Sequence, residues 1–251
     1  VTGMDRIEIL TERTFVLDGR QKKQFFEKIC RRVEKEPVSY ILGHREFMGF
    51  DFLVEPGVLI PRPDTEILVE AVLQTIREWN KKIEIVEVGI GTGCISVSIA
   101  ALSDAECYGV DINPKAVALS ERNAERNGIE KKTHFYYGNL FEGLPSNKMF
   151  DMIVSNPPYI RKRDMETLME DVKNYEPYNA LCGGEDGLCF YRKIASEGKR
   201  ILKKSGFVFF EIGYDEAEAV IDILTDAGYT KISVIKDLSG LDRVVKARLE
   251  D

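Results

Sequence analysis

The sequence contains few of the residues that build metal sites, disulfide networks or membrane spans. Only two histidines occur among 251 residues, and the five cysteines form no Cys-x-x-Cys pair, so we expect no metal site and the reduced thiols of a cytoplasmic protein. No apolar run approaches the about 18 residues that a membrane helix needs, and no signal-peptide core opens the chain. Basic residues are outnumbered by acidic ones, 35 to 42, and the net charge of −7 argues against a general nucleic-acid-binding surface.

The remaining composition is typical of a soluble globular protein, with 44% hydrophobic and 31% charged residues. The length accommodates one large domain together with a small one. The chain opens at Val1 without an initiator methionine, so we expect the natural sequence to begin upstream of it.

The first part of the chain differs in pattern from the rest. Residues 1–36 place apolar side chains at helical spacing among Lys, Arg and Glu, which predicts two or three short amphipathic helices. Residues 46–54 are typical of two strand pieces around a glycine turn, and we interpret them as a β-hairpin linker. The predicted boundaries are 1–43 for a helical domain, 44–63 for the linker and 64–251 for a larger domain.

Beyond residue 64, predicted helices and strands alternate along the chain. The predicted helices span 66–79, 94–102, 114–127, 187–204 and 215–227, and the predicted strands span 84–88, 107–110, 134–137, 150–154, 207–211, 231–235 and 243–249. This alternation is typical of a doubly wound α/β domain, with the last two strands as an antiparallel pair at the sheet edge.

Three of the strand ends carry residues suited to an adenosine-type ligand. The loop Gly89-Ile90-Gly91-Thr92-Gly93 follows the first strand and permits close backbone approach, and Asp111 ends the second strand, where an acid accepts hydrogen bonds from ribose hydroxyls. Glu87 would repel a pyrophosphate but favour a cationic ligand such as S-adenosylmethionine. Asn139 and Leu140, after the third strand, can reach and cover an adenine ring. Structural turn and core roles remain the alternative for each.

The segment Asn156-Pro157-Pro158-Tyr159 follows the strand at 150–154, at the sheet edge where ligands bind. The two prolines stiffen the backbone and cannot donate hydrogen bonds. Asn156 Oδ1 and the Pro157 carbonyl can accept both hydrogens of a planar amino group while Tyr159 stacks on its face. Such a grip would hold a weakly nucleophilic nitrogen in line with an activated methyl group. The alternative is a solvent-exposed turn.

Other polar residues carry weaker indications. Arg62 and Asp64 precede the helix at 66–79 and suit either a local helix cap or the wall of an active site. We interpret His44 and His134 as structural, because methyl transfer to an amide nitrogen needs no strong base beforehand.

Taken together, these motifs resemble the HemK/PrmC family, whose members methylate the glutamine of the Gly-Gly-Gln motif in peptide-chain release factors. The residues that carry the resemblance are Pro37-Val38-Ser39-Tyr40-Ile41-Leu42-Gly43, Pro61-Arg62-Pro63-Asp64-Thr65-Glu66, Glu87 to Gly93, Asn156 to Ile160, Gly183 to Leu188 and Asp237 to Arg243. The resemblance implies a Rossmann-like, seven-stranded S-adenosylmethionine-dependent methyltransferase domain, preceded by a helical substrate-recognition domain and a hairpin linker.

The resemblance also implies roles for individual residues. Glu87, the 89–93 loop, Asp111, Asn139, Leu140 and Asn156 would hold S-adenosylmethionine and its product S-adenosylhomocysteine, while Asn156 to Tyr159, with Arg62 nearby, would hold the glutamine. Three features depart from the family pattern: Asp64 stands where Glu is more usual, Asn139-Leu140 replaces an acidic-aromatic pair, and the N-terminal region is short. We therefore expect part of the recognition domain to lie outside this chain.

Two other functions stay open at this point. One is an amino-methyltransferase that acts on a nucleobase in DNA or RNA, against which the acidic composition counts. The other is a non-catalytic sensor of an adenosyl ligand, against which the intact Asn156 counts. Our main hypothesis is a monomeric cytoplasmic enzyme whose partner is a release factor, with no direct contact to nucleic acid or membrane.

Overall fold

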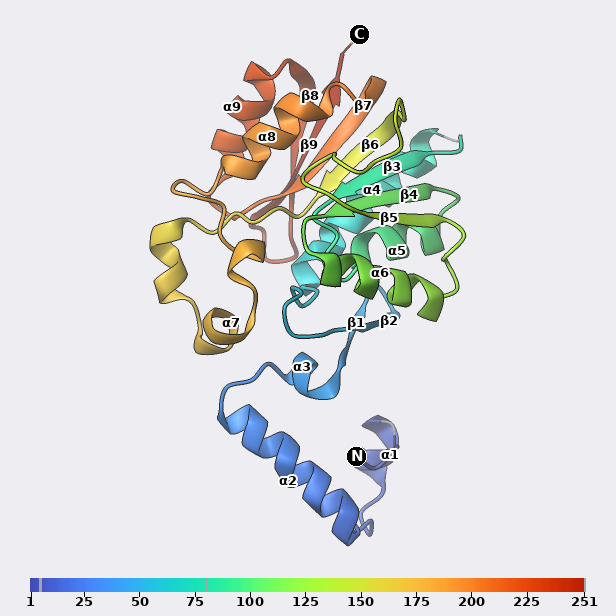
Figure 1. Cartoon of the computed structure of the whole chain (residues 1–251), viewed down its shortest axis with the longest axis vertical. Coiled ribbons are helices and arrows are strands. Elements are labelled where there is room, and N and C mark those ends of the chain that lie inside the picture. The colour runs from blue at the N-terminus through green and yellow to red at the C-terminus, as the bar shows by residue number, and fades with distance from the viewer. Residues whose placement is uncertain (5, 80, 251) are drawn as a thin grey trace.

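The computed structural model describes residues 1–4, 6–79 and 81–250. Asp5, Asn80 and Asp251 fall inside the predicted domain ranges but outside the described residues. Most of the chain folds around one seven-stranded sheet with helices on both faces (Figure 1). Its strands, in the order in which they lie side by side, are β5 (Thr133–Tyr137), β4 (Glu106–Asp111), β3 (Glu84–Val88), β6 (Phe150–Ser155), β7 (Leu202–Glu211), β9 (Asp242–Leu249) and β8 (Tyr229–Lys236).

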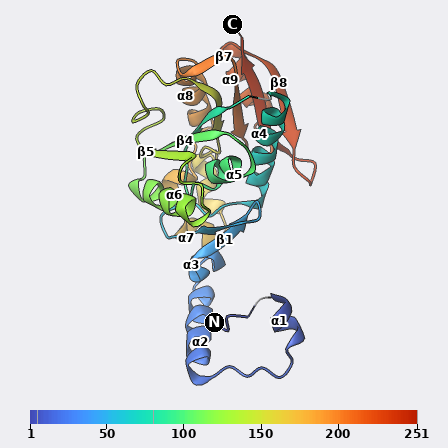
Figure 2. The same ribbon diagram turned by 90° about the vertical axis from the view of Figure 1, so that its right-hand side faces the viewer.

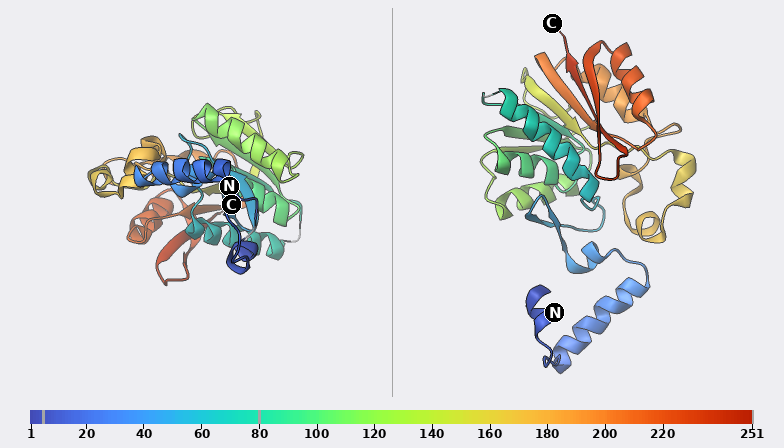
Figure 3. Two further views of the ribbon diagram at one scale, coloured as in Figure 1. Left: turned by 90° about the horizontal axis from the view of Figure 1, so that it is seen from below. Right: turned by 180° about the vertical axis from the view of Figure 1, so that it is seen from behind.

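The sheet is parallel from β5 to β7, and β9 runs antiparallel to both of its neighbours. Helices α4 (Glu66–Trp79), α5 (Cys94–Leu102) and α6 (Pro114–Arg126) cover one face, and α8 (Cys189–Gly198) and α9 (Ala217–Asp226) cover the other (Figure 3). The central strands are therefore apolar on both sides, which is why they appear in the sequence as short continuous hydrophobic runs. The predicted Rossmann-like fold with an antiparallel edge pair is confirmed.

Several predicted elements agree with the structure residue by residue, including α4, β3 and α5. The helix predicted over 187–204 is wrong at its end, because Leu202 begins β7, where it is buried and pairs with Phe150. The Lys203-Lys204-Ser205-Gly206 run, which has the composition of a helix end, lies within that strand. Ser205 there has a φ of 62°, and the register between β6 and β7 shifts beside it.

The N-terminal part stands away from the sheet and joins it through α3 (Val38–Leu42) and the hairpin of β1 (His44–Phe47) and β2 (Phe50–Leu53), as Figure 2 shows. It begins with α1 (Arg6–Thr11) and α2 (Gly19–Val33), which confirms the predicted amphipathic helices and hairpin. No side chain of α2 is buried, and its apolar residues Phe25, Phe26, Ile29 and Val33 are exposed. No helix within residues 1–4, 6–79 and 81–250 is long and apolar enough to cross a membrane.

Residues 161–182, which we call the side lobe, project from the sheet between β6 and α8 (Figure 1). The side lobe contains the short helices η2 (Lys162–Thr167), α7 (Glu170–Tyr175) and η3 (Tyr178–Ala180), none of which the sequence pattern predicts, because three to six residues are too few to establish a period. Tyr175 Oη donates to the Glu34 carbonyl at 2.6 Å, and Arg32 lies 3.6 Å from Asp171. The side lobe therefore contacts the end of α2.

Candidate functional site

A cavity of about 420 Å³ lies at the carboxyl edge of the parallel strands, where ligands bind in open α/β sheets. The segments that follow β3, β4, β5 and β6 all contribute to its wall, together with parts of the linker, the side lobe and α8. The residues are Gly57 to Leu59, Val88, Gly89, Gly91, Val110 to Pro114, Ala116, Gly138 to Leu140, Ser155 to Pro158, Pro177, Asn179, Ala180, Phe190 and Ile194. The structure thus brings the predicted glycine loop, Asp111, Asn139, Leu140 and the Asn-Pro-Pro turn together.

The glycine loop after β3 needs its three glycines for two different reasons. Gly89 and Gly91 have φ angles of 79° and 55° and line the cavity, and a Cβ on either would meet no atom within 4 Å. Their missing side chains leave the backbone bare toward the cavity, as a closely bound ligand requires. At Gly93, φ is 78° and a Cβ would lie 2.9 Å from Ser120 Cβ, so this glycine permits close packing of the loop against α6.

Asp111, at the end of β4, is held in place by the loop it faces. Its Oδ2 accepts the Gly91 N–H at 3.0 Å, and its Oδ1 accepts the Asn113 N–H at 2.8 Å. Burial raises the pKa of Asp111, and the hydrogen bonds from Gly91 and Asn113 act against that rise. Each carboxylate oxygen has a second lone pair beyond the bond it already accepts. Because Asp111 lines the cavity, those lone pairs fit the two hydroxyls of a ribose.

Glu87 lies beneath the loop and does not line the cavity. Its Oε2 accepts the Ser96 N–H at 3.0 Å and also bonds the Ser96 hydroxyl, which fixes the start of α5 under the glycine loop. Burial raises the pKa of Glu87 to about 8, and its Oε1 is buried without a hydrogen-bond partner. Ile90, Thr92 and Gly93 are likewise buried in the loop and do not line the cavity. These four residues shape the loop from behind.

Two further predicted residues belong to the turn after β5. Leu140 has a positive φ of 54°, is buried, and packs with the hydrophobic cluster under α8. Asn139 precedes it in the cavity wall, and the Gly138 N–H donates to the Asp111 carbonyl at 3.0 Å. The turn is therefore tied to the end of β4. It forms an apolar floor with one amide beside it, a combination suited to an adenine ring.

The Asn-Pro-Pro turn is braced from outside the cavity. Ile160 N–H donates to the Leu181 carbonyl at 2.9 Å, and Gly183 N–H donates to the Ile160 carbonyl at 2.9 Å. A Cβ at Gly183 would lie 2.6 Å from the Pro158 carbonyl oxygen, so only glycine permits this approach. Asn156 itself is half-buried at the cavity edge, where its Nδ2 donates to Thr65 Oγ1 at 3.1 Å.

The structure does not bring Tyr159 or Arg62 into the cavity wall. Tyr159 packs against the hydrophobic cluster beneath α8, and burial raises the pKa of its hydroxyl. Arg62 Nη2 lies 2.5 Å from Glu176 Oε1, and Glu176 Oε2 also accepts the Ile60 N–H at 3.3 Å. Arg62 thus fastens the linker to the side lobe, rather than reaching the cavity.

Part of the cavity wall comes from residues that the sequence analysis does not indicate. Phe190 and Ile194 of α8, Pro177, Asn179 and Ala180 of the side lobe, and Gly57 to Leu59 of the linker complete the wall. Only the Pro56-Gly57 turn leaves a recognisable trace in the sequence. Pro177, Asn179 and Ala180 reach the cavity only because the side lobe folds back toward the sheet.

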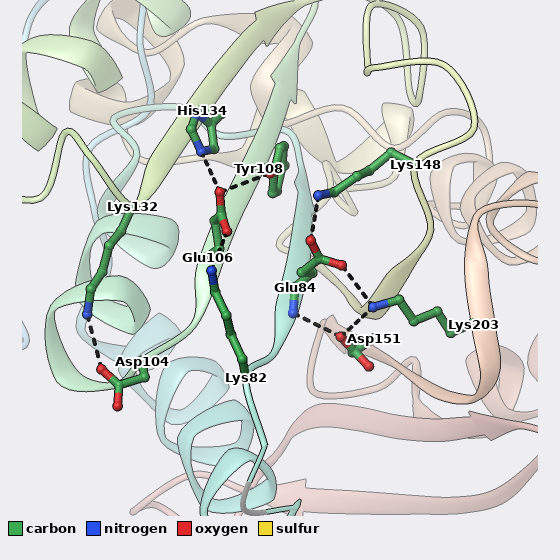
Figure 4. A network of polar contacts seen from close by, with 10 residues as sticks. All are labelled: Lys82, Glu84, Asp104, Glu106, Tyr108, Lys132, His134, Lys148, Asp151 and Lys203. Atoms are coloured by element: carbon green, nitrogen blue, oxygen red, sulfur yellow. Dashed lines mark hydrogen bonds and ion pairs between the residues drawn. The ribbon is translucent and has the colours of Figure 1, made fainter.

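A wider depression of about 820 Å³ lies at the opposite edge of the sheet, and the two acids in its wall, Glu106 and Asp104, are paired with Lys82 and Lys132. Figure 4 shows this edge, where Lys82 contacts Glu106 at 2.9 Å and Lys148 contacts Glu84 at 2.5 Å. Hydrogen bonds from Lys82 and His134 lower the pKa of Glu106 to about 2. The network binds neighbouring strand ends together, whereas the glycine loop, Asp111 and Asn156 line the cavity at the carboxyl edge, which we take as the candidate site. The described residues contain no group of three or more His, Cys, Asp or Glu side chains that could hold a metal ion.

Comparison with known proteins places these features in a family. The family model for the PrmC N-terminal domain matches residues 1–43, and that for the methyltransferase small domain matches residues 61–174. The chain is 46% identical to a release factor glutamine methyltransferase from Clostridium acetobutylicum, over 98% of this chain and 87% of the relative. It is 40% identical to a protein of the same name from Geobacter sulfurreducens, over 98% and 85% of the two chains.

Solved structures share the fold at lower sequence identity. A methyltransferase from Pyrococcus furiosus superposes with a TM-score of 0.61 at 15% identity, covering 93% of this chain and all of that one. A 16S rRNA N2 G1207 methyltransferase from T. thermophilus, in complex with AdoMet and guanosine, gives a TM-score of 0.58 at 19% identity over 82% and 50% of the two chains. These similarities support the fold described above.

Proposed function

The chain belongs to the family of release factor glutamine methyltransferases, and on that basis we propose how its cavity performs the reaction. The enzyme transfers a methyl group from S-adenosylmethionine to the side-chain amide nitrogen of the glutamine in the Gly-Gly-Gln motif of peptide-chain release factors. One observation supports the assignment of the site: the bare glycine loop, the Asp111 carboxylate and the Asn156-Pro157 corner line the same cavity.

The residues of the cavity fit the cofactor. Asp111 has lone pairs free for both ribose hydroxyls, Gly89 and Gly91 let the ligand approach the backbone, and Asn139 with Leu140 borders the adenine. When bound, S-adenosylmethionine supplies a methyl group activated by a sulfonium. We assign Glu87 an indirect role, because it supports the loop from beneath through its hydrogen bonds with Ser96 and does not line the cavity. S-adenosylhomocysteine would leave from the same cavity.

The Asn156-Pro157 corner holds the substrate amide. Asn156 Oδ1 and the Pro157 carbonyl accept its two hydrogens, which directs the nitrogen lone pair toward the methyl group. As the nitrogen–carbon bond forms and the carbon–sulfur bond breaks, positive charge grows on the nitrogen, and the two acceptor oxygens stabilise it. The extra proton leaves the nitrogen to solvent after transfer. Pro158 keeps the turn rigid, and Tyr159 supports it from the core side.

The other parts of the chain would recognise the protein substrate. We assign residues 1–43 to a recognition domain, 44–63 to the linker and 64–251 to the catalytic domain. The exposed apolar residues of α2 supply a surface for the release factor. A monomer acting in the cytoplasm, where release factors work, completes the proposal. The relatives favour this substrate over the nucleobase alternative.

Methyl transfer to a purified release factor tests the proposal. Labelled S-adenosylmethionine should label the wild-type factor and leave its Gln→Ala variant unlabelled. Equal labelling of both factors, or transfer to ribosomal RNA in place of the factor, would contradict it. Size-exclusion chromatography during purification checks the monomer.

A further inference from the structure

Thr65 and Glu211 lie behind Asn156 on the face of the sheet that α4 covers. Ser155 of β6 pairs with Phe210 of β7, so the next residues, Asn156 and Glu211, both point to the opposite face from that pair. Thr65, in the 3-10 turn η1 (Pro63–Thr65) that opens α4, lies between them. Its Oγ1 accepts the Asn156 Nδ2–H at 3.1 Å, and its side chain is hydrogen-bonded to the Glu211 carboxyl.

Both residues behind Asn156 are shielded from water. Thr65 is 3% exposed and Glu211 is 1% exposed, and Glu211 Oε2 is buried without a hydrogen-bond partner. Burial raises the pKa of Glu211 to about 7, and the hydrogen bond from Thr65 and the nearby Arg243 act against that rise. The other charged or titratable groups that face Glu211 are Arg62, Asp64, Cys94, Tyr159 and Tyr191. Above its pKa the carboxylate can only accept hydrogen bonds.

This chemistry gives the chain of hydrogen bonds one direction. The Thr65 hydroxyl has a single hydrogen, and it donates this hydrogen in a hydrogen bond to an ionised Glu211. The oxygen of Thr65 then faces Asn156 as an acceptor, so the amino end of the Asn156 amide must turn toward Thr65. The carbonyl end, Oδ1, is left to face the cavity.

We propose that Glu211 and Thr65 are positioning residues that fix the orientation of the Asn156 amide and thereby select glutamine over glutamate in the substrate. This inference rests on the proposed function and adds to it a source of substrate discrimination. The amino group of a glutamine side chain donates a hydrogen bond to Asn156 Oδ1. A glutamate side chain has only acceptor oxygens, which Oδ1 repels. If the Asn156 amide were free to turn, its amino group would donate a hydrogen bond to the glutamate carboxylate and the discrimination would be lost.

The test compares the affinities of full-length enzyme variants for two release factors, one with the native Gly-Gly-Gln and one with Gln→Glu. Binding is measured by calorimetry in the presence of S-adenosylhomocysteine, above the pKa of Glu211. Thr65→Val removes the hydroxyl, Thr65→Ser keeps it, and Glu211→Gln replaces the carboxylate by a group that can donate. Thr133→Val is the matched control, since Thr133 is also buried but bonds only the Ile129 carbonyl at the far end of β5.

The wild-type enzyme and the Thr65→Ser and Thr133→Val variants should prefer the glutamine factor to the same degree. In Thr65→Val and Glu211→Gln the preference should fall about tenfold, the worth of one oriented hydrogen bond. A wild-type ratio near one, or an unchanged ratio in Thr65→Val and Glu211→Gln proteins that melt like the Thr133→Val control, would overturn the inference. Failure of wild-type methyl transfer to glutamine would instead count against the proposed function.

Discussion

Replacing Asp111 by asparagine should weaken binding of S-adenosylmethionine about fivefold while leaving the fold in place. Both carboxylate oxygens of Asp111 already accept a backbone N–H, from Gly91 and Asn113. An asparagine has one acceptor oxygen and one amino group, so the amino group must oppose one of these two N–H donors. One ribose hydroxyl therefore loses the charged carboxylate oxygen that accepts its hydrogen bond in the wild type.

The magnitude follows from these two losses. Replacing a charged acceptor by a neutral one for a ribose hydroxyl costs about 1 kcal/mol, and setting two donors against each other costs at least about 1 kcal/mol more. The clash between two donors is present with and without ligand, so it lowers thermal stability and cancels from Kd. The remaining loss of about 1 kcal/mol corresponds to about a fivefold increase in Kd.

Isothermal titration calorimetry with S-adenosylmethionine measures this effect directly. Asp104→Asn is the control, because Asp104 is an exposed acid at the opposite edge of the sheet, paired with Lys132 at 3.4 Å. Its Kd should match that of the wild type. If Asp111→Asn bound the ligand within twofold of the wild type, Asp111 would not hold the ribose and the assignment of the cavity would be wrong.

Further predictions concern the loop, the buried acids and the substrate corner. Gly93→Ala should destabilise the fold more than Gly128→Ala, because both glycines have positive φ but only a Cβ at Gly93 meets Ser120. Thermal unfolding should show the two losses in free energy of unfolding differing by about 1–3 kcal/mol. Equal losses would refute close packing at Gly93. Without cofactor, the free energy of unfolding should decrease as pH rises between 4.5 and about 8, because burial raises the folded-state pKa of Glu87 and the folded state therefore binds the proton more tightly. Urea titrations at several pH values should show that this decrease with pH is smaller in Glu87→Gln than in the wild type. The same pH dependence in both proteins would count against the prediction. Asn156→Ala should lose at least about a hundredfold in kcat while its Kd for S-adenosylmethionine stays within threefold, as single-turnover transfer and calorimetry would show; retention of kcat would exclude its role at the substrate amide.

Much of the fold and of the cavity can be predicted from local sequence. The strands are short apolar runs bounded by glycine, proline and polar residues, and α4 shows its buried face through regularly spaced Leu68, Val72 and Thr75. Since parallel strands end at one edge, residues that follow several strands must converge there. For this reason Asp111 and Asn156 could be placed in one site without knowledge of any contact.

The remaining features depend on contacts between distant segments. The sequence predicts that Tyr159 stacks on the substrate, but Tyr159 lies against the core because the segment after it pairs with residues 181–183. The sequence suits Arg62 to a local helix cap or to the wall of the active site, yet Arg62 contacts Glu176 of the side lobe, whose fold has no periodic signal. The sequence around Thr65 does not indicate the role that we propose for it, because that role depends on contacts with Asn156 and Glu211, which lie far away in the sequence.

The central claim is that the Asn156-Pro157 corner presents the glutamine amide nitrogen to the methyl donor. A crystal structure of the enzyme with S-adenosylhomocysteine and a release factor tests it most directly. We predict that the glutamine amide nitrogen lies within hydrogen-bonding distance of both Asn156 Oδ1 and the Pro157 carbonyl, and faces the sulfur of the bound product. A glutamine bound away from this corner, or turned with its amide oxygen toward Asn156, would contradict the account.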